Sequence, residues 1–229
     1  MNIFLEFIGA KSPSWPYVAP LVVFLALVGL SPHVPVGPEV YYPLRVVLVS
    51  AVLLIWSRKL VRLDASRWGG SVAVGLLVFV IWISPDLLWP GYRSHWLLQN
   101  ALTGPVTSSL PQALRRNTGF LIWRVAGSVV LVPIVEELFW RAWLMRYLIS
   151  RHFEKVPLGA FTQASFWICA LLFASEHGPY WDVGLAAGIV YNWWMVRTRN
   201  VANCIVAHAV TNACLAAWVL GTGNWQYWL

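Results

Sequence analysis

The feature that most constrains the fold is a series of long apolar segments that recurs along the whole chain. Only 11% of the residues are charged and 59% are hydrophobic, whereas soluble domains carry about 25% charged residues. The sequence therefore predicts an all-α protein, a polytopic membrane bundle of about seven to eight transmembrane helices. The seven apolar runs cover residues 17–30, 40–56, 70–83, 120–149, 164–177, 183–196 and 202–220.

Basic residues lie between these runs, and their distribution predicts how the chain crosses the membrane. If the N-terminus is cytoplasmic, ten Lys and Arg residues fall in cytoplasmic segments and three fall outside. The positive-inside rule therefore places the N-terminus in the cytoplasm and the C-terminus outside. The net charge of +7 resides in loops without an aromatic-interleaved basic face, so we expect a lipid bilayer as partner and no nucleic acid.

The segments between the apolar runs indicate one integral membrane domain. Residues 84–117 are rich in Pro and Gly and predict an external loop with a short interfacial helix. We therefore divide the chain into N-terminal helices with this loop, residues 1–117, and a helical core, residues 118–229. The first apolar run is expected to be an uncleaved helix, since no small-residue cleavage site follows it. Three cysteines inside apolar runs predict buried, unpaired thiols.

A few polar residues interrupt the apolar runs, and these are the candidates for function. Ionisable groups at membrane depth are costly and usually face the bundle interior, where they form functional sites. The candidates are Glu136, Glu137, Arg141, His177, His208 and Asn212, with Arg45, Arg124 and Asn192 as further residues that could line a cavity or, for the arginines, extend to an interface.

The spacing of the two glutamates gives them different environments. Glu137 precedes Arg141 by four residues, the favoured order for an ion pair on one helix face. Glu136 points about 100° away, so it is left as an unpaired carboxylate that could act as a general base. Pro133 lies one turn earlier, and we expect a kink and a freed backbone carbonyl beside the acids.

Helix arithmetic predicts that residues from three apolar runs meet. Phe173 and His177 share a helix face, as do His208 and Asn212, because each pair is four residues apart. Folding the fourth and fifth runs about a turn near residue 154 places Glu136 level with about Phe173 and one helical turn from His177. His208 falls about 8 Å from Glu136 in depth, a gap that helix tilt can close.

These residues resemble the motifs of a known family. "EELFWR", "FASEH" and "HAVTN" are similar to the motifs EExxxR, FxxxH and HxxxN of the CPBP family, the CAAX proteases and bacteriocin-processing enzymes. Family members usually have Phe-Arg-Gly across the arginine, whereas this chain has Trp140, Arg141 and Ala142. The composition also resembles the CAAX protease-related branch associated with exosortase systems in bacteria.

The resemblance implies an intramembrane glutamic endopeptidase with residues 118–229 as its catalytic core. By it, Glu136 and His177 would activate water, while His208 and Asn212 would stabilise the oxyanion. The supporting residues would be Glu137, Arg141 and Phe173. The expected location is a bacterial inner membrane, and the expected substrate is a membrane-anchored protein or peptide, cleaved near its C-terminus.

Two alternatives remain open at the level of sequence. Two histidines and a glutamate can also bind catalytic zinc, but no HExxH pair is present, so we expect no cofactor and no metal. A non-enzymatic immunity, scaffold or sorting-partner protein could retain the same polar cluster. Hydration of the cluster discriminates between these classes, because hydrolysis needs water beside Glu136.

Overall fold

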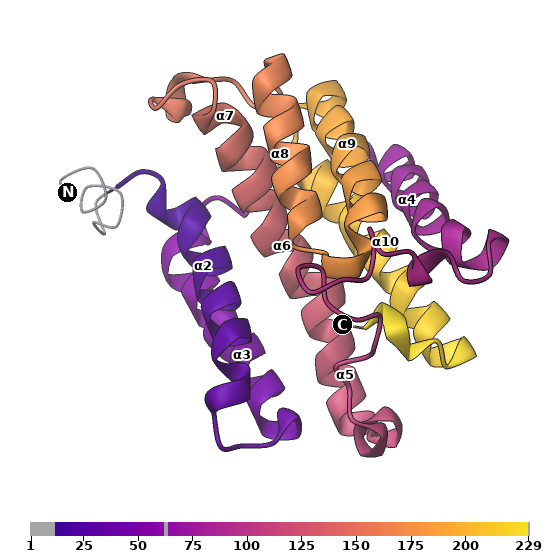
Figure 1. Cartoon of the computed structure of the whole chain (residues 1–229). Helices are drawn as coiled ribbons and strands as arrows, with labels where there is room; N and C mark the ends of the chain where they lie inside the picture. Colours follow the sequence, from indigo (N-terminus) through magenta and orange to yellow (C-terminus); the bar gives the residue numbers. More distant parts are fainter. Residues whose placement is uncertain (1–11, 62–63, 229) are drawn as a thin grey trace.

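The computed structural model describes residues 12–61 and 64–228, and every regular element within them is helical (Figure 1). The predicted all-α fold is therefore confirmed. The α-helices are α2 (Trp15–Leu30), α3 (Pro38–Val52), α4 (Trp68–Leu88), α5 (Thr118–Ala126), α6 (Val132–Glu137), α7 (Met145–Tyr147), α8 (Gln163–Ser175), α9 (Trp181–Thr198) and α10 (Val201–Thr222).

Five helical segments are long and apolar enough to cross a membrane. They are Trp15–His33, Pro38–Ser57, Trp68–Leu88, Thr118–Tyr147 and Val201–Thr222. Each corresponds to one of the seven predicted spans. The other two predicted spans form α8, which has 13 residues, and α9, which has 18, and neither is among the five.

The segment Thr118–Tyr147 runs as one column of 30 residues through the molecule (Figure 1). It contains two π-helical stretches, Gly127–Leu131 and Leu138–Leu144, on either side of α6. Pro133 lies in the first turn of α6, directly after the first π-helical stretch, so its missing N–H falls inside the continuous column. The kink and the freed carbonyl expected at Pro133 stay predictions, while the column itself contains π turns, which often occur at functional sites.

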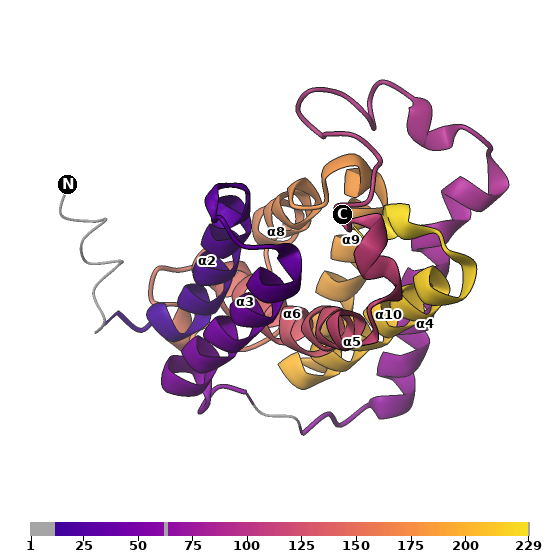
Figure 2. The same ribbon diagram turned by 90° about the horizontal axis from the view of Figure 1, so that it is seen from below.

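The long column separates two groups of helices (Figure 2). The α2–α3 hairpin lies on one side, while α4, α8, α9 and α10 lie on the other. Although α4 precedes residue 118 in sequence, it packs closely along α10. Thr211 Oγ1 donates a hydrogen bond to the Gly75 carbonyl at 2.8 Å, and a Cβ at Gly75 would overlap the Ala207 carbonyl oxygen. The N-terminal segment therefore contributes a helix to the same bundle.

The predicted external loop begins later than residue 84. Helix α4 continues through Pro85 to Leu88, because a proline removes one helical hydrogen bond, which membrane helices tolerate. In place of the expected interfacial helix, the loop contains two short 3₁₀ turns, Tyr92–Ser94 and Gln112–Arg116. The prediction of a loop was therefore wrong for residues 84–88.

Candidate active site

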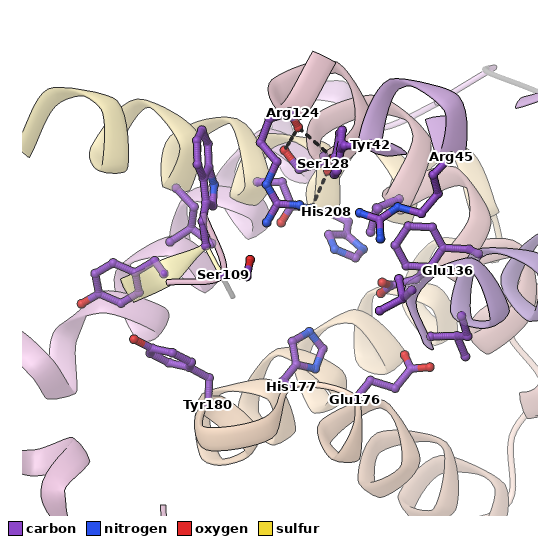
Figure 3. A pocket seen from close by; sticks show the side chains of 18 of the residues that line it. Tyr42, Arg45, Ser109, Arg124, Ser128, Glu136, Glu176, His177, Tyr180 and His208 are labelled. Atoms are coloured by element: carbon purple, nitrogen blue, oxygen red, sulfur yellow. Dashed lines mark hydrogen bonds between the residues drawn. The ribbon is translucent and has the colours of Figure 1, made fainter. Parts of the chain in front are cut away.

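A cavity of about 510 Å³ lies between the α2–α3 hairpin, the long column and helices α8 to α10. All four residues predicted to act in catalysis line it, and Figure 3 shows Glu136, His177 and His208 around one space. The expectation that three separate apolar runs meet is thus confirmed. Besides several tyrosines, the polar and charged residues of the lining are Ser31, Arg45, Ser109, Arg124, Ser128, Glu136, Glu176, His177, His208, Thr211 and Asn212.

The predicted ion pair between Glu137 and Arg141 is present and completely buried. Arg141 Nη1 donates to Glu137 Oε1 at 3.1 Å, and both side chains are 0% exposed. Arg141 Nε donates to Asn192 Oδ1 at 3.1 Å, and its guanidinium carbon lies 4.3 Å from the centre of the Phe173 ring. Asn192 and Phe173 therefore hold the arginine on the carboxylate, and Phe173 takes part through its aromatic face.

His208 joins the same carboxylate from α10. Its Nδ1 lies 2.9 Å from Glu137 Oε1, and its ring stacks on Tyr191 with centres 5.1 Å apart. The Tyr191 hydroxyl in turn donates to Thr211 Oγ1 at 2.7 Å. Glu137 thereby orients the imidazole, and the other nitrogen, Nε2, is left for a ligand in the cavity.

Glu136 has a different environment from its neighbour Glu137. It is 9% exposed and lines the cavity, and its Oε2 atom is buried without a hydrogen-bond partner among the described residues. No ion pair within residues 12–61 and 64–228 includes it. A buried carboxylate needs a hydrogen-bonding partner, and a water molecule in the cavity would supply one.

His177 follows α8 in a turn that leads to α9. Gly178 adopts φ +51° in this turn, a left-handed conformation that glycine allows. His177 Nδ1–H donates to the Phe173 carbonyl oxygen at 2.8 Å. Because a carbonyl only accepts, this bond places the proton of the neutral ring on Nδ1 and leaves a lone pair on Nε2. The Trp82 ring packs at 5.1 Å from the imidazole and fixes its position.

Asn212 is held by the first π-helical stretch of the column. Its Nδ2 group donates to the Ser128 carbonyl oxygen at 2.8 Å. Ser128 lies within Gly127–Leu131, where the π-helical turn places backbone carbonyls differently from an α-helix. The amide is therefore oriented, and it retains one N–H and its own oxygen for a ligand.

Several residues of the cavity escaped the sequence analysis as site residues. Tyr191 and Trp82 contact the two histidines, and Glu176 and Thr211 line the same space. Aromatic residues are so frequent in this chain that these two carry no individual signal. Glu176 could have been identified as a site residue from the sequence, because it directly precedes the candidate His177.

The cysteines and the possible metal ligands bear on two further predictions. Cys169, Cys204 and Cys214 are free thiols, as predicted. The first two are buried, but Cys214 is only partly buried, so the prediction of burial was wrong for Cys214. In the part of the chain that the structure describes, no group of three or more His, Cys, Asp or Glu residues is arranged to hold a metal ion. The absence of a metal requirement stays a prediction.

Comparison with known proteins shows a similarity for a segment in the C-terminal half of the chain. Residues 118–214 match the family model described as Type II CAAX prenyl endopeptidase Rce1-like. No curated protein and no solved structure matches the chain. The matched segment contains Glu136, His177, His208 and Asn212 and ends two residues after the last motif. The similarity that the three motifs indicate is therefore confirmed: residues 118–214, fewer than half of the chain, are similar to the Rce1-like family of CAAX endopeptidases.

Proposed function

We propose that this protein is an intramembrane endopeptidase that hydrolyses a peptide bond near the C-terminus of a membrane-anchored protein. One observation carries the proposal: the unpaired Glu136 carboxylate and the His177 imidazole, with a lone pair on Nε2, line the same cavity. Both groups can accept a proton from a water molecule between them. The match of residues 118–214 to an endopeptidase family supports this reaction class.

In the proposed reaction, Glu136 and His177 take one proton from water as its oxygen adds to the peptide carbonyl. The resulting oxyanion would accept hydrogen bonds from Asn212 Nδ2 and from His208 Nε2. Donation by His208 requires a proton on both ring nitrogens, and the Glu137 carboxylate at Nδ1 would stabilise that imidazolium. The C–N bond then breaks, and the proton taken from water passes to the leaving amine.

The test is the appearance of new C-termini in membrane proteins of cells that produce the protein. We expect Glu136→Gln to abolish these termini, because it removes the proton acceptor. We expect His208→Ala to lower the cleavage rate by about 10²–10³-fold, the usual effect of losing one oxyanion donor. Mass spectrometry of the membrane fraction measures both.

Two exposed residues of the loop between α7 and α8 provide matched controls. Glu154→Gln and His152→Ala make the same chemical changes away from the cavity and should leave cleavage unchanged. If a folded Glu136→Gln or His208→Ala protein retained full activity, the endopeptidase mechanism would be refuted. If the protein produced no new termini at all, a scaffold or immunity role would explain the cluster instead.

A further inference from the structure

The loop after α4 presents apolar side chains at its surface. Residues 94–114 contain no Asp, Glu, Lys or Arg, although about a quarter of the residues in a soluble domain are charged. Trp96 is 69% exposed, Leu97 46% and Leu102 95%. Single apolar residues are normal on a surface, but three of them within residues 95–104 mark an interaction surface. We call residues 95–104 the loop tip.

The backbone of the loop tip is held by hydrogen bonds within the loop itself. Asn100 Oδ1 accepts from the backbone N–H groups of Leu102 and Thr103, at 2.8 and 3.1 Å. The Gly104 N–H donates to the Asn100 carbonyl oxygen at 2.8 Å, and the Asn100 N–H donates to Thr103 Oγ1 at 3.0 Å. Leu102 therefore lies on a closed turn, and these four N–H groups need no water. Such pairing is what an apolar environment requires of a backbone.

The loop tip is attached to the turn that follows His177. Trp181 Nε1 donates to the Leu97 carbonyl oxygen at 3.0 Å. The Thr103 carbonyl oxygen approaches Gly178 so closely that a Cβ there would lie 2.9 Å from it. Figure 1 accordingly shows the loop beside the lower ends of α8 and α9. The loop tip thus lies at the end of the bundle where the chain passes from α8 to α9.

The position of the loop is continuous with surfaces that face lipid in a membrane-spanning chain. Leu87 and Leu88 at the end of α4 are exposed, as are Leu171 and Leu172 on α8. Seen along the long column, the loop extends sideways beyond α8 and α9 (Figure 2). The column is long and apolar enough to cross a membrane, so a loop that extends sideways from it runs along the membrane surface.

We propose that the loop tip is a membrane anchor, in which Trp96, Leu97 and Leu102 insert among the lipid headgroups at this end of the bundle. Tryptophan is enriched at that depth, and irregular backbone that faces lipid does not occur in the hydrocarbon core. A protein partner would also cover apolar side chains, but the lipid-facing surfaces of α4 and α8 lead directly to the loop. The bilayer is therefore the partner that the position of the loop favours.

The test places a nitroxide at residue 102 of the full-length protein in palmitoyl-oleoyl phosphatidylcholine nanodiscs. Leu102→Cys is labelled in a Cys214→Ser background, because Cys214 is only partly buried while the other two thiols are buried. Electron paramagnetic resonance measures how often the label collides with molecular oxygen, which concentrates in lipid, and with a nickel chelate, which stays in water. The oxygen-to-nickel ratio of the two collision rates reports the depth of the label.

Two further labelling positions calibrate this ratio. Leu171→Cys on α8 is the lipid-facing control, and His152→Cys in the loop between α7 and α8 is the water-facing control. We expect the ratio at residue 102 to be severalfold higher than at residue 152 and closer to that at residue 171. A ratio equal to that of the His152→Cys protein would overturn the anchor. Low collision rates with both reagents would also overturn it, because protein, such as a second copy of the chain, would then cover Leu102.

Asn100→Ala tests the closed turn. It frees the N–H groups of Leu102 and Thr103, so we expect a more mobile label and an oxygen-to-nickel ratio that falls toward the value at residue 152. Asn224→Ala is the matched control, since the Asn224 side chain makes no cap hydrogen bond to the turn that follows it, and both readouts should stay unchanged. An unchanged ratio in the Asn100→Ala protein would contradict the closed turn as the basis of the anchor. The ratio does not depend on cleavage, so the anchor and the proposed endopeptidase are tested separately.

Discussion

Adjacent glutamates with different partners are the central feature at the residue scale, and they predict opposite effects on stability. Glu137 accepts from both Arg141 and His208, so Glu137→Gln leaves a buried cation without its partner. We expect this change to lower the free energy of unfolding by about 3–5 kcal/mol. Glu136→Gln removes a buried carboxylate that has no protein partner, and we expect unchanged or higher stability.

Thermal unfolding of the purified variants in detergent measures this contrast. Glu39→Gln, at an exposed position of α3, is the control for loss of a carboxylate. A Glu137→Gln protein as stable as the unmodified one would argue against a structural role for the ion pair. A strongly destabilised Glu136→Gln protein would show that the Glu136 carboxylate makes a stabilising interaction with a group outside the described residues.

The histidines give a second residue-scale prediction, on metal dependence. His177 Nδ1 bonds to a backbone carbonyl and His208 Nδ1 bonds to Glu137, so each retains only Nε2. These nitrogens and Glu136 do not form a metal-binding group within the described residues. We expect 1,10-phenanthroline to leave the cleavage rate unchanged. Loss of activity in the chelator, with recovery on adding zinc, would establish the zinc-dependent mechanism instead.

Spacing within one helix was predictable, but pairing between helices was not. The Glu137–Arg141 pair follows from a separation of four residues, since such side chains lie on one face. The contact of His208 with Glu137 depends on how α10 is rotated against the column, and no local pattern encodes that rotation. For the same reason, the sequence left the positions of Arg45 and Arg124 undecided.

At the scale of the element, the π-helical stretches explain how one column presents several groups to the cavity. A π turn adds a residue to the helical repeat and changes the direction of the side chains that follow it. The apolar periodicity of residues 120–149 correctly predicted a helix there, but it does not distinguish α from π turns. The Ser128 carbonyl that holds Asn212 could therefore not be identified from the sequence.

The contact of α4 with α10 provides an element-scale prediction. Gly75 allows the two helices to approach, because a Cβ at this position would overlap Ala207 O and lie 2.7 Å from Val210 Cβ. Gly75→Ala should push the helices apart and lower the free energy of unfolding by about 1–3 kcal/mol. Since α10 carries His208, cleavage activity should fall as well.

Gly69→Ala is the matched control, because it lies in the same helix and a Cβ there meets nothing within 4 Å. Thermal unfolding and the cleavage assay are applied to both variants. Equal behaviour of Gly75→Ala and Gly69→Ala would mean that the two helices can separate without affecting the site.

At the scale of the whole molecule, the sequence predicted the membrane class, the helical segments and the meeting of three of them at the site, but not how the N-terminal helices pack against them. Each apolar run forms a helix, and these helices were predictable because hydropathy can be read from the local sequence. The boundary placed at residue 117 separates segments of the chain, yet α4 packs against α10 across it. Long-range packing of this kind depends on complementary surfaces, and the close approach at Gly75 has no distinctive sequence signal.

A second connection across residue 117 is made by Arg93, which is 7% exposed. Its Nε donates to Asp86 Oδ1 at 2.9 Å and its Nη1 donates to the Pro179 carbonyl at 3.0 Å, while Nη1 also pairs with Asp182. Tyr92 donates to Asp182 Oδ2 at 3.0 Å; burial and this bond raise the pKa of Tyr92, so its hydroxyl remains a donor. These contacts hold the loop after α4 against the turn that follows His177.

Arg93→Gln leaves two largely buried carboxylates without their cation, and we expect it to lower the free energy of unfolding by about 3–5 kcal/mol. Because Arg93 also holds the turn at Pro179, two residues from His177, the cleavage rate of the folded fraction should fall too. Arg93→Lys should recover part of the stability but less of the activity, since a lysine cannot reproduce the forked contacts. Arg151→Gln, at an exposed loop position, is the control. An Arg93→Gln protein with normal thermal unfolding and normal cleavage would mean that His177 is positioned by α8 and Trp82 alone.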